Sequence, residues 1–218
     1  MLQRVLEPET MDTERDAAEY DAIDHSQVNR EFARHALEVC PAARSVLDLG
    51  TGTALIPIQM LQMNAALDVT AIDLAEHMLA LARRNLAREG LTQHAKLELR
   101  DVKATGYEPG RFDLIVCNSV VHHLPDPVPL FREIRRLMSE STHVLIKDLI
   151  RPDSEAELAA LVAAHTVSDT PYQRQLFADS LRAALTIPEV ERACEKAGLS
   201  SIDVRRVSDR HFCVTRRW

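Results

Sequence analysis

Short apolar runs alternate with amphipathic stretches from Ser45 to Ile150, and this alternation constrains the fold more than any other feature of the chain. Strands and helices in such an order pair as βαβ units around a parallel sheet. The sequence therefore predicts an α/β fold with a doubly wound, mostly parallel sheet. The expected strands occupy residues 45–50, 67–73, 95–101, 111–118 and 142–150, and the expected helices among them residues 54–63, 75–89 and 127–138.

The ends of the chain depart from this rhythm. Residues 1–40 are expected to form a charged, loose arm with one short helix, and then an amphipathic helix over 26–40 with Ser26 as its N-cap. The core follows over residues 41–150, and 218 residues in all are enough for a single domain.

The last third of the chain has a different pattern. Residues 151–187 hold helical stretches at 153–168 and 171–185 without a strand-like run, which predicts a helical insert or lid. Residues 188–218 hold one more helix and two strand-like runs that turn at Asp209. We expect those runs to form a hairpin that completes the core.

The charge balance argues against a nucleic-acid partner. Lys and Arg number 26 against 33 Asp and Glu, for a formal net charge of −7. Affinity for nucleic-acid phosphates comes from clustered basic side chains. The one basic concentration lies near the C-terminus, where it fits the protection of an edge strand. It consists of Arg205, Arg206, Arg210, Arg216 and Arg217.

Other composition features predict a cytoplasmic protein without a membrane span. The N-terminus is acidic and does not resemble a secretory signal, and no apolar run approaches the length that crosses a bilayer. The cysteines are far apart and form no CxxC pair, so neither a zinc site nor a disulfide framework is expected. They are Cys40, Cys117, Cys194 and Cys213.

A glycine loop and a carboxylate after the first two strands indicate a ligand that carries a ribose. Gly50 and Gly52 follow the first strand, where Gly-x-Gly allows a sharp turn and the close approach of a ligand. Asp73 ends the second strand, where a doubly wound fold binds ribose hydroxyls. Alone, the loop could be an ordinary turn and Asp73 a helix cap. Together they favour a nucleoside ligand.

The same loop distinguishes between nucleosides. A pyrophosphate is held by Gly-x-Gly-x-x-Gly, and in the run Gly50 to Leu55 the third glycine is absent. Asp48, just before the loop, would repel a pyrophosphate and attract an amino group or a cation. S-adenosylmethionine carries both a sulfonium and an α-amino group. We therefore prefer it to NAD, and an NAD-type oxidoreductase remains the less favoured alternative.

With these features, the chain resembles the class I S-adenosylmethionine-dependent methyltransferases of the small-molecule type. Residues 46–55, VLDLGTGTAL, look like their first motif, and residues 69–79, VTAIDLAEHML, like their second. LRDV at 99–102 looks like the third, and FDLIVCNSVVHHLPDP at 112–127 like the fourth. The hairpin matches their reversed last strand. The resemblance implies a Rossmann-like sheet of seven strands and S-adenosylmethionine as cofactor, with S-adenosylhomocysteine as product.

The resemblance also implies which residues bind the cofactor. These divide by the part of the cofactor they contact: Asp48, Gly50, Thr51 and Gly52 the methionine part, Asp73 the ribose, Leu74, Met78, Asp101 and Val102 the adenine, Asn118 and Ser119 the region near the sulfonium, with Tyr20 on an arm that folds over the cofactor. Met78 also fits plain helix packing. A non-catalytic S-adenosylmethionine-binding module is a further alternative.

Two adjacent histidines are the candidate catalytic residues. Methyl transfer requires alignment and exclusion of water, with a general base only if the nucleophile arrives protonated. His122 and His123 follow the fourth strand, at the mouth where the acceptor should lie, and their pKa range suits proton transfer. Related methyltransferases often carry His-His-Leu there as loop packing, so the catalytic role is a hypothesis.

The acceptor is expected to be a small molecule, methylated on oxygen, nitrogen or carbon. The run Asn118 to Val121 lacks the Asn/Asp-Pro-Pro-Tyr/Phe pattern of enzymes that methylate amino groups of bases or glutamine amides. A metal-assisted catechol mechanism would need acids after the fourth and fifth strands, where Asp148 is the one candidate, so no metal is expected. The sequence leaves the acceptor and the oligomeric state open, with a homodimer as one option.

Overall fold

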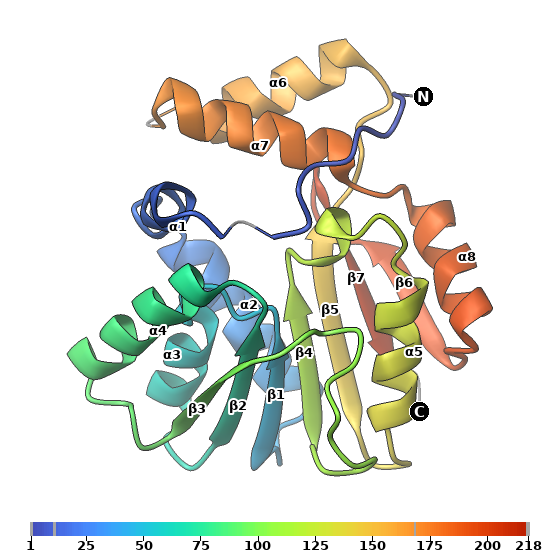
Figure 1. The fold of residues 1–218 in the computed structure, drawn as a ribbon. Helices are drawn as coiled ribbons and strands as arrows, with labels where there is room; N and C mark the ends of the chain where they lie inside the picture. The colour runs from blue at the N-terminus through green and yellow to red at the C-terminus, as the bar shows by residue number, and fades with distance from the viewer. Residues whose placement is uncertain (1, 11, 168, 217–218) are drawn as a thin grey trace.

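The computed structural model describes residues 2–10, 12–167 and 169–216, and its centre is one sheet of seven strands (Figure 1). The strand order is β3-β2-β1-β4-β5-β7-β6. Neighbouring strands from β3 to β5 pair in parallel, whereas β7 runs antiparallel to both β5 and β6. The predicted doubly wound sheet with a reversed last strand is confirmed. The strands are β1 Ser45–Leu49, β2 Asp68–Asp73, β3 Ala95–Leu99, β4 Leu114–Asn118, β5 His143–Leu149, β6 Ile202–Arg206 and β7 His211–Arg216.

Helices cover both faces of this sheet. One face packs against α2 (Ser26–Val39), α3 (Leu55–Met63) and α4 (Glu76–Arg88). The other packs against α5 (Val128–Leu137) and α8 (Ile187–Ala197). Each helix presents an apolar stripe to the sheet, and burial of these stripes is the main term that stabilises the three layers.

The central strands are mostly apolar because both of their faces are buried, and the exceptions, such as Asp48 in β1 and Asp148 in β5, lie toward their carboxyl ends. In β1, Val46 packs in the cluster with α2 and α3, while the next residue, Leu47, packs in the cluster with α5 and α8. Successive side chains of a strand point to opposite faces, so a strand between two helical layers is apolar on both of its faces. This is why the apolar runs of the sequence locate the strands to within a few residues.

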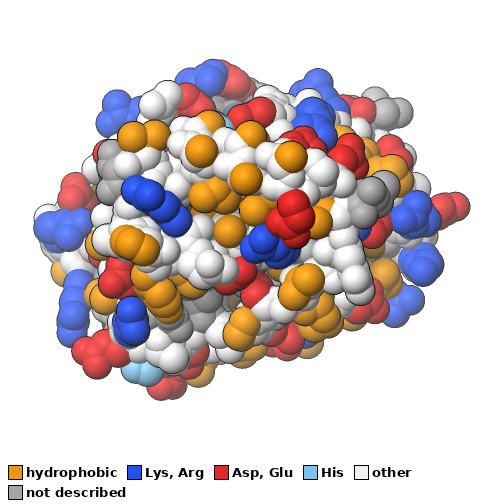
Figure 2. Space-filling view, turned by 90° about the horizontal axis from the view of Figure 1, so that it is seen from above, with side chains coloured by type: hydrophobic (Ala, Val, Ile, Leu, Met, Phe, Trp, Pro, Cys, Tyr) orange, Lys and Arg blue, Asp and Glu red, His pale blue; other side chains and the backbone are white. Residues whose placement is uncertain are grey.

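The insert folds as two antiparallel helices above the carboxyl ends of the strands. They are α6 (Glu155–His165) and α7 (Pro171–Ala183), and Ser154 caps the first by accepting the N–H of Glu157. The two helices expected in this insert are present, although Ser168, at the end of the first expected helix, lies outside the described residues, and the role of the insert as a lid stays a prediction. Figure 2 looks down on this face, where hydrophobic side chains gather with charged ones mostly around them.

The N-terminal arm, residues 2–10, runs beneath α7 and across the ends of the strands (Figure 1). The Arg4 guanidinium donates to the carbonyl oxygens of Ala183 at 2.6 Å and Leu124 at 2.8 Å. The Val5 N–H donates to the Arg182 carbonyl at 3.2 Å. The arm is therefore anchored, and the expectation of a loose segment was wrong. A single guanidinium satisfies carbonyls from the lid and from the loop after β4.

The arm leads into α1 (Glu14–Asp21), and α2 begins a few residues later. The predicted N-cap, Ser26, is instead the first helical residue of α2, and the capping position is taken by His25 without a side-chain bond. Asp24 accepts the Ser26 N–H at 3.0 Å, at the position before the cap. Among the described residues, no helix is long and apolar enough to cross a membrane.

Candidate active site

A cleft opens at the carboxyl ends of β1, β2 and β4, where the strand order reverses between β1 and β4. Open α/β sheets bind their ligands at this topological position, because the loops on either side of it separate. The cleft is lined by Glu9, Thr10, Tyr20, Gly50, Thr51, Gly52, Ile56, Asp73, Leu74, Ala75, Met78, Asp101, Val102, Lys103, Asn118, Ser119, Val120, His123 and Leu124.

The glycine loop after β1 forms one wall. Gly50 has a φ of +74°, and a Cβ there would lie 2.2 Å from Cγ2 of Val120, so a side chain does not fit. Gly52 has a φ of +54°, and a Cβ built there would lie 3.9 Å from the Tyr20 ring. Ala54 also has a positive φ, 61°, at the N-cap of α3, where a glycine would be less strained. The glycines thus allow the loop to lie close to its neighbours.

Asp73, at the tip of β2, connects this loop to the next helix. Its Oδ2 accepts the Gly52 N–H at 2.7 Å, and its Oδ1 accepts the Ala75 N–H at 2.9 Å. Burial raises the pKa of this carboxyl, although the hydrogen bonds from Ala75 and Gly52 oppose the shift. The carboxylate therefore lines the cleft with both oxygens fixed by backbone donors.

Asp48 lies behind the loop and does not line the cleft. It is 2 % exposed, and burial raises its pKa to about 7. Its Oδ2 and the hydroxyl of Thr53 are buried without a hydrogen-bond partner among the described residues, whereas the Thr51 hydroxyl lies close enough to the Asp48 carboxyl to oppose the rise in its pKa. Buried polar atoms without partners are costly, which indicates that a ligand with donor groups belongs beside this loop.

The opposite end of the cleft is more apolar. Met78 is 5 % exposed and packs with Ala17 and Ala75, while Leu74 is 41 % exposed. Asp101 accepts the backbone N–H of Lys103 at 2.8 Å and also pairs with its ammonium group at 3.1 Å. The Asp101 carboxylate can accept a hydrogen bond from the exocyclic amine of a purine. The neighbouring apolar side chains can pack against the face of the purine ring.

Two further residues join the walls. Tyr20 packs against the cluster of Ala17, Ala75 and Met78, and burial raises its pKa to about 12. Ser119, directly after β4, has a φ of +58°, which is uncommon for a residue other than glycine. Backbone strain of this kind is often found at functional sites, and Ser119 lines the cleft.

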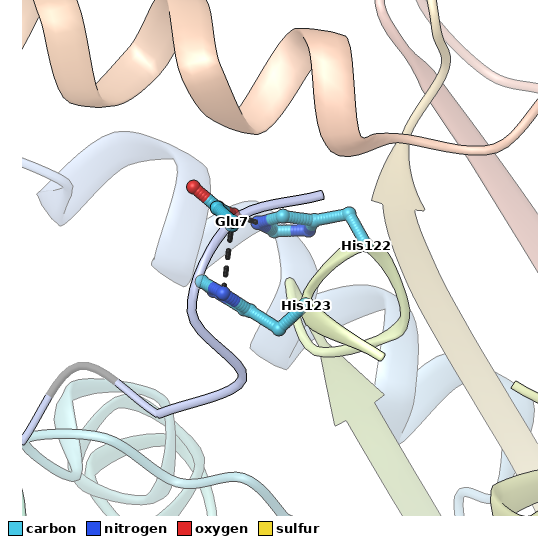
Figure 3. A group of neighbouring side chains, drawn as sticks. All are labelled: Glu7, His122 and His123. Atoms are coloured by element: carbon cyan, nitrogen blue, oxygen red, sulfur yellow. Dashed lines mark ion pairs between the residues drawn. The ribbon is translucent and has the colours of Figure 1, made fainter. Parts of the chain in front are cut away.

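The paired histidines lie on the short 3-10 helix η1 (Val121–His123) and have different environments (Figure 3). His122 is 3 % exposed and does not line the cleft. Its Nδ1 lies 2.5 Å from Oδ1 of Asp148, and its Nε2 lies 3.4 Å from Oε1 of Glu7. Burial lowers the pKa of His122, but the Asp148 carboxylate outweighs this effect and the net pKa is raised.

His123, in contrast, lines the cleft. Its Nδ1 lies 3.1 Å from Oε1 of Glu7, and the rings of His122 and His123 are 4.2 Å apart. Burial, together with the neighbouring His122, lowers the pKa of His123 to about 3. At neutral pH this imidazole is therefore uncharged, whereas His122 is held by carboxylates on both sides.

The structure brings most of the predicted site together. Every predicted cofactor residue except Asp48 lines the cleft, and of the two histidines His123 does so. Sequence reasoning did not identify Glu7, Glu9, Thr10 and Lys103. The three arm residues belong to a charged segment without periodicity, and nothing in the sequence distinguishes them from a solvated tail.

The family follows from comparison with known proteins. The model of a methyltransferase domain family matches residues 42–198. The chain belongs to this family. It is 28% identical over 178 residues to a ubiquinone biosynthesis O-methyltransferase of Xanthomonas euvesicatoria pv. vesicatoria, an alignment that covers 81% of this chain and 70% of the relative.

Solved structures show the same fold. A Methanococcus maripaludis protein assigned to the S-adenosyl-L-methionine-dependent methyltransferases has a TM-score of 0.75 at 20% identity, covering 98% of this chain and 97% of that one. The plantazolicin methyltransferase BpumL, in complex with S-adenosylhomocysteine, has a TM-score of 0.68 at 15% identity, covering 93% and 90%. Because the chain belongs to a methyltransferase family, it is an enzyme that uses S-adenosylmethionine, and the oxidoreductase alternative is excluded.

Proposed function

We propose that this methyltransferase transfers a methyl group from S-adenosylmethionine to an oxygen atom of a small organic acceptor. The observation that carries the proposal is the position of His123, an uncharged imidazole in the cleft wall beside Leu124 and near Ser119. A hydroxyl acceptor needs a polar partner at this point, and apolar neighbours suit the carbon skeleton that bears it. The O-methyltransferase named among the relatives supports the choice of oxygen.

We further propose how the chain holds its cofactor. The Asp73 carboxylate accepts the ribose hydroxyls, and Asp101 with Val102 contacts the adenine. The methionine part lies along Gly50 to Gly52, near the buried oxygens of Asp48 and Thr53, which lack donors. Tyr20 and the arm cover this part, and Asn118 and Ser119 close the site near the sulfonium. When bound, S-adenosylmethionine supplies a methyl carbon activated for displacement.

The histidines have separate roles in this proposal. His123 contacts the acceptor and donates a hydrogen bond that orients its oxygen toward the methyl group. Because its pKa is lowered to about 3, this imidazole is too weak a base to take the hydroxyl proton, and the acceptor reacts as the oxyanion. His122 is enclosed between Asp148 and Glu7, so it positions the short helix η1 and has no direct contact with the acceptor. The arm and lid exclude water, which would otherwise compete with the acceptor for the site.

The decisive experiment is a turnover assay with matched acceptors. Purified protein and S-adenosylmethionine are incubated with small phenols and catechols, and with the amines and thiols of the same carbon skeletons. S-adenosylhomocysteine formation and product mass are followed, and the methylated atom is assigned by NMR. We expect methyl ethers from hydroxylated acceptors. Methylation confined to nitrogen, sulfur or carbon would overturn the assignment of oxygen while leaving the cofactor site intact.

A further inference from the structure

Beside the cofactor cleft, three side chains from two distant segments converge on one point (Figure 3). Glu7 comes from the N-terminal arm, and His122 and His123 come from η1. Oε1 of Glu7 lies 3.4 Å from Nε2 of His122 and 3.1 Å from Nδ1 of His123. One ligand atom from each side chain lies within 4.8 Å of the others. The three side chains are 12%, 4% and 17% exposed, respectively.

The contact between Glu7 and His123 is close but does not form a hydrogen bond. Nδ1 of His123 is buried and has no hydrogen-bond partner among the described residues, although the carboxylate oxygen is only 3.1 Å away. Buried ring nitrogens of histidine are normally paired. An atom placed between the two groups would satisfy both of them, and this unpartnered nitrogen points to a ligand.

The surroundings of His122 resemble those of a metal-binding histidine. Oδ1 of Asp148 lies 2.5 Å from its Nδ1, which directs the other nitrogen, Nε2, toward Glu7. Asp148 is itself fixed, since its Oδ2 accepts the Val121 N–H at 2.6 Å. A histidine that binds a metal usually donates its second ring N–H to such a carboxylate, which sets its tautomer and orientation.

We propose that Glu7, His122 and His123 bind one divalent transition-metal ion. Two imidazoles and one carboxylate are a donor set typical of Zn²⁺ and Fe²⁺, whereas Mg²⁺ and Ca²⁺ prefer oxygen ligands throughout. The carboxylates of Glu7 and Asp148 offset the two positive charges of the ion. The nearby Arg4 guanidinium opposes binding, but it donates to the carbonyls of Ala183 and Leu124.

The ion fastens the arm over the cofactor. Glu7 precedes Glu9 and Thr10, which line the cleft, so an ion bound to Glu7 holds that part of the wall in place. Ion binding and cofactor binding must then strengthen one another by the same factor. The ion occupies Nδ1 of His123, the ring nitrogen that has no hydrogen-bond partner among the described residues. This site does not depend on the proposal that the acceptor atom is oxygen.

Equilibrium titration tests the site without any need for turnover. Zn²⁺ is titrated by calorimetry into the full-length protein after chelator treatment, and the variants Glu7→Gln and His123→Gln are compared. His165→Gln is the control, because His165 pairs with Asp209 at 2.6 Å on α6, outside the cluster. We expect one ion per chain, at least about 100-fold weaker binding in both cluster variants and unchanged binding in the control. Circular dichroism verifies that each variant is folded.

A second measurement tests the coupling to the arm. Affinity for S-adenosylhomocysteine is measured with and without Zn²⁺, and we expect the ion to increase it in the wild type and in His165→Gln but not in Glu7→Gln. Co²⁺ should give the absorption bands of a site with nitrogen ligands in the wild type. The proposal is overturned if the wild type binds no ion, or if Glu7→Gln and His123→Gln bind Zn²⁺ as tightly as His165→Gln does.

Discussion

The carboxylate of Asp73 accepts the backbone N–H of Gly52 at 2.7 Å, and so the end of β2 holds the glycine loop that follows β1. The two residues belong to different motifs of the sequence and meet because β1 and β2 are parallel neighbours with Leu49 opposite Ile72. One oxygen atom of Asp73 thus shapes the loop while the carboxylate as a whole lines the cleft. This residue combines a structural and a binding role.

Replacement of Asp73 should weaken cofactor binding strongly. In Asp73→Ala the ribose hydroxyls lose a charged acceptor and the loop loses its bond to Gly52, so we expect about 100-fold or greater loss of affinity for S-adenosylhomocysteine. Isothermal titration calorimetry measures the change. Asp68→Ala is the matched control, because Asp68 begins the same strand and is exposed at its far end. Equal affinities in wild type and Asp73→Ala would remove the ribose site proposed here.

Gly50 and Gly90 form a natural pair for testing the crowding of the loop. Both have a left-handed φ, +74° and +69°, but a Cβ at Gly50 would meet Val120 at 2.2 Å and one at Gly90 would meet nothing within 4 Å. Gly90→Ala should destabilise by about 1–2 kcal/mol from the backbone alone. Gly50→Ala should add about 1–3 kcal/mol from overpacking.

Urea unfolding measures both changes, and a double variant isolates the crowding. Val120→Ala removes the γ-methyl groups that the new Cβ would meet, so Gly50→Ala should cost less stability in that background than in the wild type. The difference is the coupling free energy of a double-mutant cycle. Identical costs for Gly50→Ala and Gly90→Ala would show that the loop relaxes away from Val120.

The sheet could be predicted from sequence because its strands are apolar on both faces. Errors occurred at their ends, where polar side chains take over the backbone bonds. The expected strand over 95–101 ends at Leu99, since Asp101 turns back to accept the Lys103 N–H. The expected strand over 111–118 begins only at Leu114, and just before it the Asp113 carboxylate accepts the N–H groups of Arg44 and Ser45. Local apolar pattern carries no information about such contacts.

The arm shows a second limit of sequence reasoning. Arg4 reaches carbonyls of Leu124 and Ala183, which are far away in the chain. Glu7 likewise meets His122 and His123, whose importance the sequence indicated without revealing their partner. A contact between a charged arm and backbone carbonyls leaves no periodic signal. The cofactor motifs could be located in the sequence because each of them follows a strand. The arm residues that lie over these motifs could not be located in this way.

Asp48 should make cofactor binding dependent on pH near neutrality. Burial raises its pKa to about 7, so it is largely protonated below that pH and carries its charge above it. The charged form attracts the amino group and sulfonium of S-adenosylmethionine, and affinity should therefore rise as the pH increases from about 6 to 8. Calorimetry across this range measures the rise. Asp48→Asn should remove most of it, and an equally steep rise in that variant would contradict the role.

The same group should affect the stability of the ligand-free protein in the opposite direction. A carboxyl whose folded-state pKa is raised binds a proton more tightly in the folded state, so its contribution to stability is fully present below the unfolded value of about 3.9 and is lost as pH rises through about 7. The urea midpoint of Asp48→Asn, relative to that of the wild type, should therefore increase between about pH 5 and pH 8. A constant difference between the two proteins would show that Asp48 does not titrate in this range.

Loss of the Arg4 anchor should release the arm without unfolding the core. In Arg4→Ala the carbonyls of Leu124 and Ala183 lose their charged donor. Leu124 follows η1 and Ala183 ends α7, so the arm loses its link to both of these segments. The arm contributes Glu9 and Thr10 to the cleft wall, so its release should speed cofactor dissociation several-fold. Hydrogen exchange of residues 2–10 should rise, while exchange in β1 and β4 should stay slow because their burial is independent of the arm. Arg30→Ala is the control, since Arg30 lies on α2, away from the arm, and bonds only to Gln59 among its described hydrogen bonds. If residues 2–10 exchange equally in Arg4→Ala and Arg30→Ala, the arm is held by its other contacts, and the ion pair of Glu9 with Lys103 becomes the next anchor to remove.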